Sequence, residues 1–236
     1  MCCTGRGSCY SGQLYLIFYL VSLTMSVADS LARIETWLAA HAPRILRESL
    51  NPGAASAALD RLETTVGRPL PADYRTLYQR FDGLNQAADN LGSFWYGPRF
   101  LPLAQVTGNY QSSAADSEVS PLSKVPAIRQ DNALNPFWLR LGFDGSHVWL
   151  CLDLDPASEG QYEQVILLDE EAETAFVVAG SVSSLLRDFA QDLEQDRYVL
   201  NPDALEDGDR YLDPVQAIDV VNWYHAERWQ DKVNGC

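Results

Sequence analysis

The sequence is poor in the residues that build the commonest catalytic and metal sites. Its 236 residues include only three His and five Cys, and three of the Cys (Cys2, Cys3 and Cys9) lie in the first nine positions. No CxxC pair has zinc-ligand spacing, and the 15 glycines form no phosphate-binding fingerprint. We therefore expect no metal, no cofactor and no disulfide framework, and we predict a reducing, cytoplasmic setting.

Basic residues are also scarce, and their distribution is uneven. The chain has 17 Lys and Arg against 32 Asp and Glu, a formal net charge of −15. Residues 1–149 hold 12 acids and 12 bases, whereas residues 150–236 hold 20 acids and five bases. Nucleic-acid binding needs clustered Lys and Arg, so we exclude it. An acidic surface favours basic partners, or it serves only solubility.

Long apolar runs are limited to one, residues 14–23. This run is too short for a membrane span, which needs about 20 residues. Residues 1–24 are either an over-extended start, since Met25 opens a clean start before an amphipathic helix, or a signal or anchor, since Ser26-Val27-Ala28 loosely resembles a cleavage site. We expect the first alternative, treat residues 1–24 as a non-domain segment and predict no membrane partner.

The remaining pattern runs from helices to strands and back to helices. Apolar residues at helical spacing predict helices over residues 29–42, 54–66, 71–81 and 181–195. Four strands are predicted over 137–143, 147–153, 164–169 and 175–179, the first two joined by the hairpin signal Asp144-Gly145. This order is typical of an α+β fold with a mostly antiparallel sheet flanked by helices.

The segments outside this pattern are less regular. Residues 94–96 and 100–101 are expected as short strands, and 105–136 as a long loop with at most one short helix. Beyond the helix that ends near 195, we predict an acidic loop and then a final helix that starts at Asp213-Pro214. The predicted organisation is one domain over 25–195, with residues 196–236 packing on it.

A few residues are candidates for chemistry. Asp153 and Asp155 could hold a metal or act as an acid–base pair, but either site needs further converging ligands, so we interpret them as a polar strand end and an Asp-Pro turn. Cys151 alternates with Trp149 along a strand, as a small core residue does. The three His are far apart and no nucleophile motif accompanies them, so we predict no catalytic residue.

Two features are candidates for partner binding. Trp95, with Tyr96 and Trp138, lines an exposed recognition groove in one interpretation and packs in the core in the other. Residues 153–173 contain eight carboxylates and no Lys or Arg. That stretch is either a solvated acidic face or a docking surface for a basic protein.

Several segments in this order resemble the SUKH superfamily, which is named for fungal cell-wall synthesis regulators and related bacterial proteins. The first half of the resemblance is carried by Gly67-Arg68-Pro69-Leu70-Pro71-Ala72-Asp73-Tyr74 and Phe81-Asp82-Gly83-Leu84. The second half is carried by Trp138, Asp144-Gly145, Asp153-Leu154-Asp155-Pro156, Gln164-Val165-Ile166 and Ser181-Val182-Ser183-Ser184-Leu185-Leu186. The resemblance covers roughly residues 50–195, and Glu163 stands where the family usually has Gly.

The resemblance implies a binding protein and not an enzyme. Bacterial members commonly act as immunity proteins that neutralise a toxin, and an acidic inhibitor suits a basic, nuclease-type toxin. We therefore predict an immunity protein whose toxin-binding surface includes Asp153, Asp155, Glu170, Glu171 and Trp95. The alternative is a regulatory scaffold or signalling adaptor like the fungal members; a hydrolase that uses Asp153 with a histidine is a weaker third hypothesis.

Overall fold

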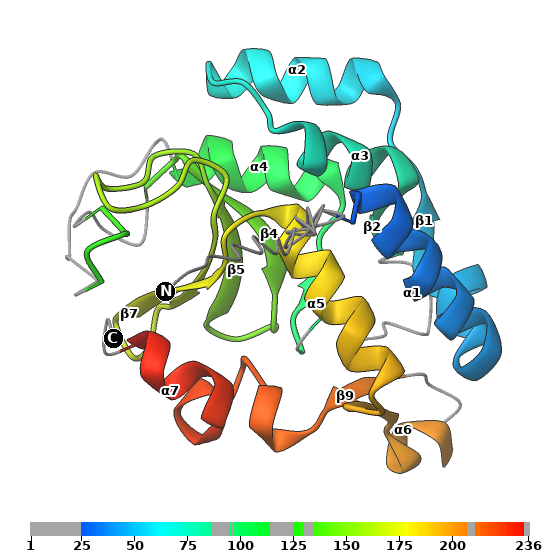
Figure 1. Ribbon diagram of the computed structural model, residues 1–236. Coiled ribbons are helices and arrows are strands. Elements are labelled where there is room, and N and C mark those ends of the chain that lie inside the picture. Colours follow the sequence, from blue (N-terminus) through cyan, green and yellow to red (C-terminus); the bar gives the residue numbers. More distant parts are fainter. Residues whose placement is uncertain are drawn as a thin grey trace, which may run out of the picture.

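A five-stranded antiparallel sheet forms the centre of the structure (Figure 1). The structure is a computed structural model, and it describes residues 25–85, 95, 97–113, 125–129, 135–206 and 211–233. Each strand pairs with the next in the chain, in the order β3 (Arg99–Phe100), β4 (Trp138–Phe143), β5 (Val148–Asp153), β6 (Val165–Asp169) and β7 (Thr174–Ala179). Sequential antiparallel neighbours need only short connections, which agrees with the closely spaced patterns of β4–β7 in the sequence; the longer connection from β3 to β4 contains α4.

The hairpin between β4 and β5 shows how the local sequence fixes the register. The Asp144 carboxylate oxygen Oδ1 accepts hydrogen bonds from the backbone N–H groups of Ser146, His147 and Val148 at 2.8–3.0 Å. Gly145 has φ +98°, a backbone conformation that L side chains rarely adopt. The Asp-Gly pair therefore closes the turn, and Trp138 of β4 is opposite Asp153 of β5.

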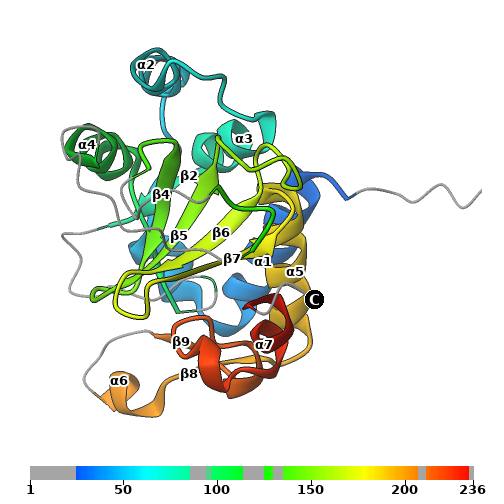
Figure 2. The same ribbon diagram turned by 90° about the vertical axis from the view of Figure 1, so that its left-hand side faces the viewer.

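Helices from both ends of the sequence cover the sheet. α1 (Val27–His41) and α5 (Val182–Glu194) pack side by side along it (Figures 1 and 2). Each begins with a capping box, formed by Ser26 with Asp29 and by Ser181 with Ser184, which satisfies the first backbone N–H groups. The other helices of this part are α2 (Ser56–Val66), α3 (Ala72–Arg80), α4 (Leu103–Ser113) and a π-helical turn, η1 (Ile45–Ser49).

Two small antiparallel ribbons complete the sheet structure. β1 (Leu50–Pro52) pairs with β2 (Phe81–Leu84), and β8 (Tyr198–Leu200) pairs with β9 (Leu212–Pro214). After β9 the chain forms the short 3₁₀ turns η2 (Gln216–Ile218) and η3 (Trp223–His225), then α7 (Glu227–Val233); α6 (Pro202–Glu206) lies between the two strands of the second ribbon.

The C-terminal segment packs on the central sheet. α7 contacts β7, and its Trp229 is 2% exposed, with its ring centroid 6.2 Å from that of Phe176. The indole N–H of Trp223 donates to Asp169 Oδ2 at 2.8 Å, which ties η3 to the end of β6. Across the described ranges, none of the helices has the length and apolar character that crossing a bilayer requires.

The α+β fold with an antiparallel sheet is confirmed, and the four predicted strands agree with β4–β7 within one residue at each end. Two predictions about segments were wrong: β8 and α6 lie in the expected acidic loop, and the last helix begins at Glu227, because residues 212–214 form β9. The short helix allowed for in residues 105–136 is α4, which begins slightly earlier, at Leu103. Trp95 lies in a turn, and residues 94 and 96 are outside the described residues.

Candidate partner-binding surface

The β6–β7 turn carries the most exposed acidic residues of the predicted docking surface. Glu170, Glu171 and Glu173 are all exposed. Beneath them, the buried Asp169 side chain accepts hydrogen bonds through Oδ1 from the backbone N–H groups of Glu171 (3.1 Å) and Ala172 (2.8 Å). These bonds hold the turn in one shape, so its glutamates form a fixed acidic surface, which we call the acidic turn (Glu170, Glu171 and Glu173).

The glutamates of this turn differ in how far neighbouring cations neutralise them. Glu170 Oε1 accepts a hydrogen bond from Arg140 Nη2 at 2.7 Å, and the Arg140 guanidinium also lies over the Trp149 ring at 4.2 Å. Glu171 is 78% exposed, and its Oε2 lies 3.3 Å from His147 Nδ1. Glu171 is therefore the more accessible charge for a partner, because most of its side chain is exposed whereas Glu170 is paired with Arg140.

Asp155 is only partly available. Its carboxylate is 15% exposed and is shared between two arginines, Arg68 Nη2 at 3.1 Å and Arg129 Nε at 2.8 Å. A carboxylate held by two guanidinium groups presents little net negative charge to a partner. Asp155 thus serves mainly as an anchor within the fold.

Asp153 does not lie on the surface, which corrects its assignment to the docking surface. Its side chain is fully buried; Oδ1 accepts from the Asp155 N–H and Oδ2 from Gln164 Nε2, both at 2.8 Å. Burial raises the pKa of Asp153 to about 6, against the opposing effect of these hydrogen bonds. Its partners belong to the fold, so it neither faces a partner nor supports the hydrolase hypothesis.

Trp95 is likewise buried, which corrects its assignment as a partner contact. It is 0% exposed, with its ring centroid 4.7 Å from that of Phe100, and Trp138 is 3% exposed. The core interpretation of these aromatic residues is therefore the right one, while Tyr96 is outside the described residues. Cys151 is also a core residue, and burial raises the pKa of its thiol to about 12, which keeps it protonated and unreactive.

The two motif groups that carry the family resemblance contact each other in space. Arg68, in the loop of residues 67–71, donates to the Leu154 carbonyl at 2.9 Å and stacks over the Phe137 ring at 3.8 Å. From the other side, the Tyr162 hydroxyl donates to the Pro69 carbonyl at 2.7 Å. The loop of residues 67–71 therefore supports the turn at residues 153–156. These contacts give the motif residues a role in stabilising the fold.

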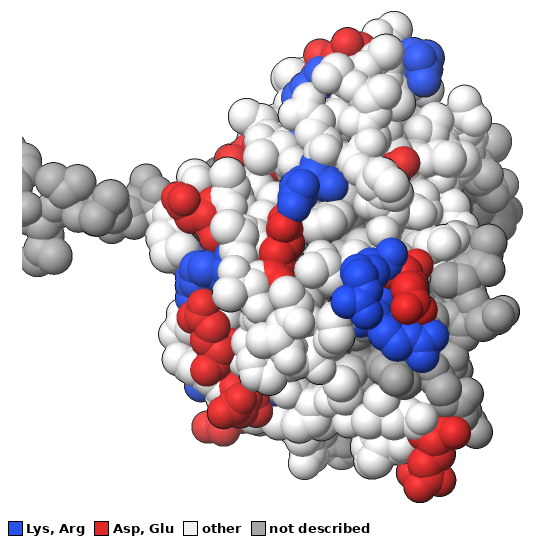
Figure 3. Space-filling model, turned by 90° about the vertical axis from the view of Figure 1, so that its right-hand side faces the viewer, with Lys and Arg blue, Asp and Glu red and all other residues white. Residues whose placement is uncertain are grey.

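The face around α1 carries side chains of both charges. Figure 3 shows cationic and acidic side chains interleaved across it. Arg33 pairs with Glu194, Arg80 with Glu35, and Arg44 with Glu48, the last pair at 2.9 Å. Each of these three pairs is close to neutral, whereas the acidic turn presents exposed carboxylates.

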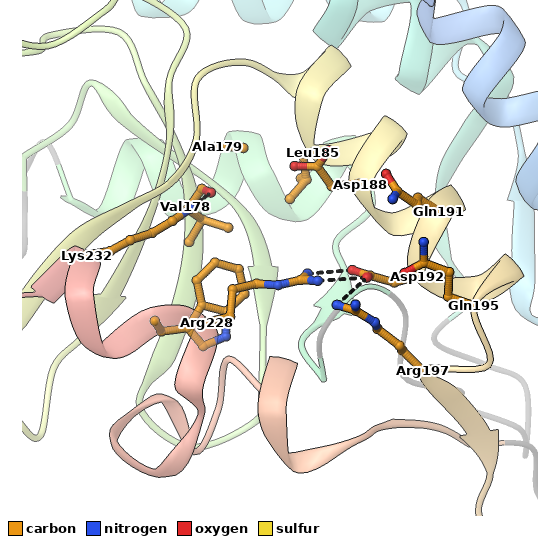
Figure 4. A pocket seen from close by; sticks show the side chains of 11 residues that line it. Val178, Ala179, Leu185, Asp188, Gln191, Asp192, Gln195, Arg197, Arg228 and Lys232 are labelled. Atoms are coloured by element: carbon orange, nitrogen blue, oxygen red, sulfur yellow. Dashed lines mark hydrogen bonds and ion pairs between the residues drawn. The ribbon is translucent and has the colours of Figure 1, made fainter.

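A cleft that the sequence analysis did not identify lies between α5, β7 and α7 (Figure 4). It has a volume of about 290 Å³ and is lined by both charge signs and by two glutamines. We call it the cationic cleft; its charged and amide lining residues are Asp188, Gln191, Asp192, Gln195, Arg197, Arg228 and Lys232. In the sequence, these cations are too far apart to indicate a common site.

The sequence motifs agree with one known family. A model of the SMI1 / KNR4 family (SUKH-1) matches residues 53–188, which is more than half of the chain. The chain belongs to the SMI1/KNR4 family. The resemblance to the SUKH superfamily is thereby confirmed.

Several curated fungal proteins are similar to this SMI1/KNR4 domain. A cell wall biosynthesis/cell cycle regulator of Schizosaccharomyces pombe is 26% identical over 198 residues, covering 77% of this chain and 39% of its own length. A KNR4/SMI1 homolog of Kluyveromyces lactis is 35% identical over 97 residues, covering 40% and 18%. The cell wall assembly regulator of Saccharomyces cerevisiae is 23% identical, covering 76% and 42%. The chain thus spans less than half the length of these relatives.

The names of two of these relatives describe them as regulators of cell wall biosynthesis or assembly. Among the residues that the structure describes, no group of three or more His, Cys, Asp or Glu could hold a metal ion. The cationic residues of the cleft, at positions 197, 228 and 232, all follow the segment that the family model matches.

Proposed function

We propose that this chain is a regulatory protein-binding domain of the kind found in fungal cell-wall regulators. The family match over residues 53–188 carries the proposal. Relatives from three fungi support it, since their names describe regulation of cell wall biosynthesis, cell wall assembly and glucan synthesis. Function would then be stoichiometric binding, with regulation achieved by bringing other proteins together.

The acidic turn is the surface that we propose for contact with a basic partner. Glu171 is 78% exposed, and the turn is held by the buried Asp169, so a partner meets a preformed charge pattern. Complementary charge speeds association and orients the encounter more than it adds affinity. Binding at this surface should therefore weaken as salt increases.

Toxin neutralisation is the second candidate, favoured by the acidic turn together with the 20 acids against five bases in residues 150–236. A basic nuclease-type toxin attracts phosphate, and an acidic inhibitor competes for the same cations. The fungal relatives support the regulatory proposal better, because their names describe regulators of endogenous processes.

Co-expression separates the two candidates. The full chain is expressed with each protein encoded beside its gene, and growth and complex formation are measured. Endogenous partners that co-purify without any toxic neighbour support the regulatory domain. Rescue from a toxic neighbour together with a 1:1 complex would replace it with the immunity protein. If neither a neighbouring protein nor an endogenous protein co-purifies with the chain, the proposal of a protein-binding domain fails.

A further inference from the structure

The cationic cleft concentrates positive charge in the most acidic part of the chain. Residues 150–236 contain only five Lys and Arg, and three of them (Arg197, Arg228 and Lys232) line this one cleft. They come from different elements: Arg228 and Lys232 are four positions apart on α7, while Arg197 follows α5 (Figure 4). The fold thus brings together cations that the sequence separates.

The arginines of the cleft are held in place by a single buried carboxylate. Arg228 donates to both oxygens of Asp192, at 2.5 and 2.8 Å, and Arg197 Nη1 lies 3.4 Å from Asp192 Oδ1. Asp192 is 3% exposed, whereas Arg228 is 24% and Arg197 43% exposed. Two guanidinium groups on one carboxylate leave a net positive charge at the cleft, and the fork of Arg228 is fixed before any ligand arrives.

Lys232 adds a third cation on the same side. Its ammonium donates to the backbone carbonyl of Val178 in β7 at 2.7 Å. Burial is the main reason that the pKa of Lys232 is lowered, and the nearby Arg228 charge lowers it further, while Asp188 opposes them. An ammonium has three donors, and a carbonyl group does not neutralise its charge, so an incoming anion would stabilise it.

From these contacts we infer that the cationic cleft binds a carboxylate group of a partner protein, such as an Asp or Glu side chain in an acidic segment. Among the described residues that line the cleft, the cations exceed the carboxylates, Asp188 and Asp192, by one, so a carboxylate monoanion balances their charge. A phosphate dianion would leave a surplus negative charge beside Asp188 and Asp192. The amides of Gln191 and Gln195 supply neutral hydrogen-bond donors on the α5 side.

The neighbouring surface fits an extended segment. A second cavity of about 390 Å³ shares Lys232, Val178 and Ala179 with the cationic cleft. Lys232 therefore lies between the two hollows, and a peptide whose carboxylate reaches it can continue along β7. This inference rests on the proposed protein-binding function, which it deepens by naming the chemistry that a partner presents at this site.

The test uses the full chain and small probes, so it does not depend on knowing the partner. The indole N–H resonance of Trp229, which lines the cleft, is followed by NMR while the peptide N-acetyl-Gly-Glu-Gly-amide is added. We expect a saturable shift with a Kd of about 1–10 mM, typical of one weak contact, and no saturable shift with the matching Gln peptide. Inorganic phosphate, the third probe, should shift the resonance less than the Glu peptide.

Substitutions in the cleft test whether the Glu peptide binds there. Arg197→Gln leaves Arg228 to neutralise Asp192, so it should fold, and it should weaken the Glu peptide about tenfold. Lys232→Met should do the same. Arg61→Gln, an equal charge change at an exposed position of α2 that does not line the cleft, should leave the Kd unchanged. Thermal unfolding of each variant confirms that it is folded.

The inference is overturned by a Gln peptide that binds as well as the Glu peptide, by a stronger response to phosphate, or by a response that persists in both cleft variants. Those outcomes would refute the cleft as a carboxylate site without affecting the result of the co-expression experiment. Conversely, a chain that captures no partner but binds the Glu peptide would refute the proposed function and not the carboxylate site.

Discussion

Asp153 is the residue at which sequence pattern and three-dimensional environment differ most. Alternation along β5 places it on one face of the sheet, but it does not reveal that Gln164 covers the carboxylate with a 2.8 Å hydrogen bond. Gln164 in turn donates to the Ala127 carbonyl at 3.0 Å, from a segment far away in sequence. Burial depends on such distant segments, so Asp153 and Trp95 could not be recognised as buried from spacing alone.

The first prediction is that Asp153 makes stability depend on pH. Its pKa is about 6 in the folded chain and near 3.8 when exposed, so above pH 6 the buried charge destabilises the fold, and this penalty declines as the pH falls toward 3.8. The unfolding free energy should rise between pH 7.5 and pH 5 by about 1 kcal/mol more in the wild type than in Asp153→Asn. Urea unfolding at both pH values measures this, and equal changes in the two proteins would contradict it.

The second prediction concerns Arg68 as the brace between the two motif groups. Arg68→Ala removes the hydrogen bond to the Leu154 carbonyl, the contact with Asp155 and the stacking on Phe137. We expect a loss of about 2 kcal/mol in unfolding free energy. Arg61→Ala is the matched control, since Arg61 is exposed on α2 and should change stability by less than about 0.5 kcal/mol. Similar losses in both variants would show that Arg68 is not a brace.

At the level of elements, local patterns predict those parts that local forces determine. The strands β4–β7 and the Asp144-Gly145 turn could be predicted because alternation and turn chemistry act within a few residues. β8 and β9 pair across a gap of 11 residues that contains α6, and β9 is only three residues long, so no periodicity marks them. The prediction that Asp153 contacts a partner was wrong for a related reason: the burial of its side chain depends on tertiary contacts, which local patterns do not reveal.

The third prediction tests whether the C-terminal segment is an integral part of the fold. Trp229 of α7 is 2% exposed against the sheet, and its indole N–H donates to the Ile218 carbonyl at 3.0 Å. Trp229→Ala should lower the unfolding free energy by about 3–4 kcal/mol. Tyr224→Ala removes an aromatic ring that is 54% exposed in the same segment and should cost less than about 1 kcal/mol. Chemical denaturation compares them, and a small effect in both would show that residues 196–236 are only loosely attached.

At the scale of the whole molecule, the charges behind the net value of −15 are distributed unevenly over the surface. The face around α1 carries several Arg–Glu pairs, the acidic turn presents exposed glutamates, and three of the last five cations line the cationic cleft. Composition predicts the acidic excess, but its division between an acidic turn and a cationic cleft depends on how α5, β7 and α7 pack.

The most direct test of the account is the salt dependence of partner binding through the acidic turn. The measurement compares the Kd of a co-purified partner for the wild type, for Glu171→Lys/Glu173→Lys, and for the control Asp203→Arg/Glu206→Arg, whose acids are exposed on α6. Glu170 is left unchanged so that its pair with Arg140 is kept. We expect the acidic-turn variant to bind about tenfold more weakly with a reduced dependence on salt, and the control to match the wild type. Unchanged affinity and salt dependence in the acidic-turn variant would contradict the account.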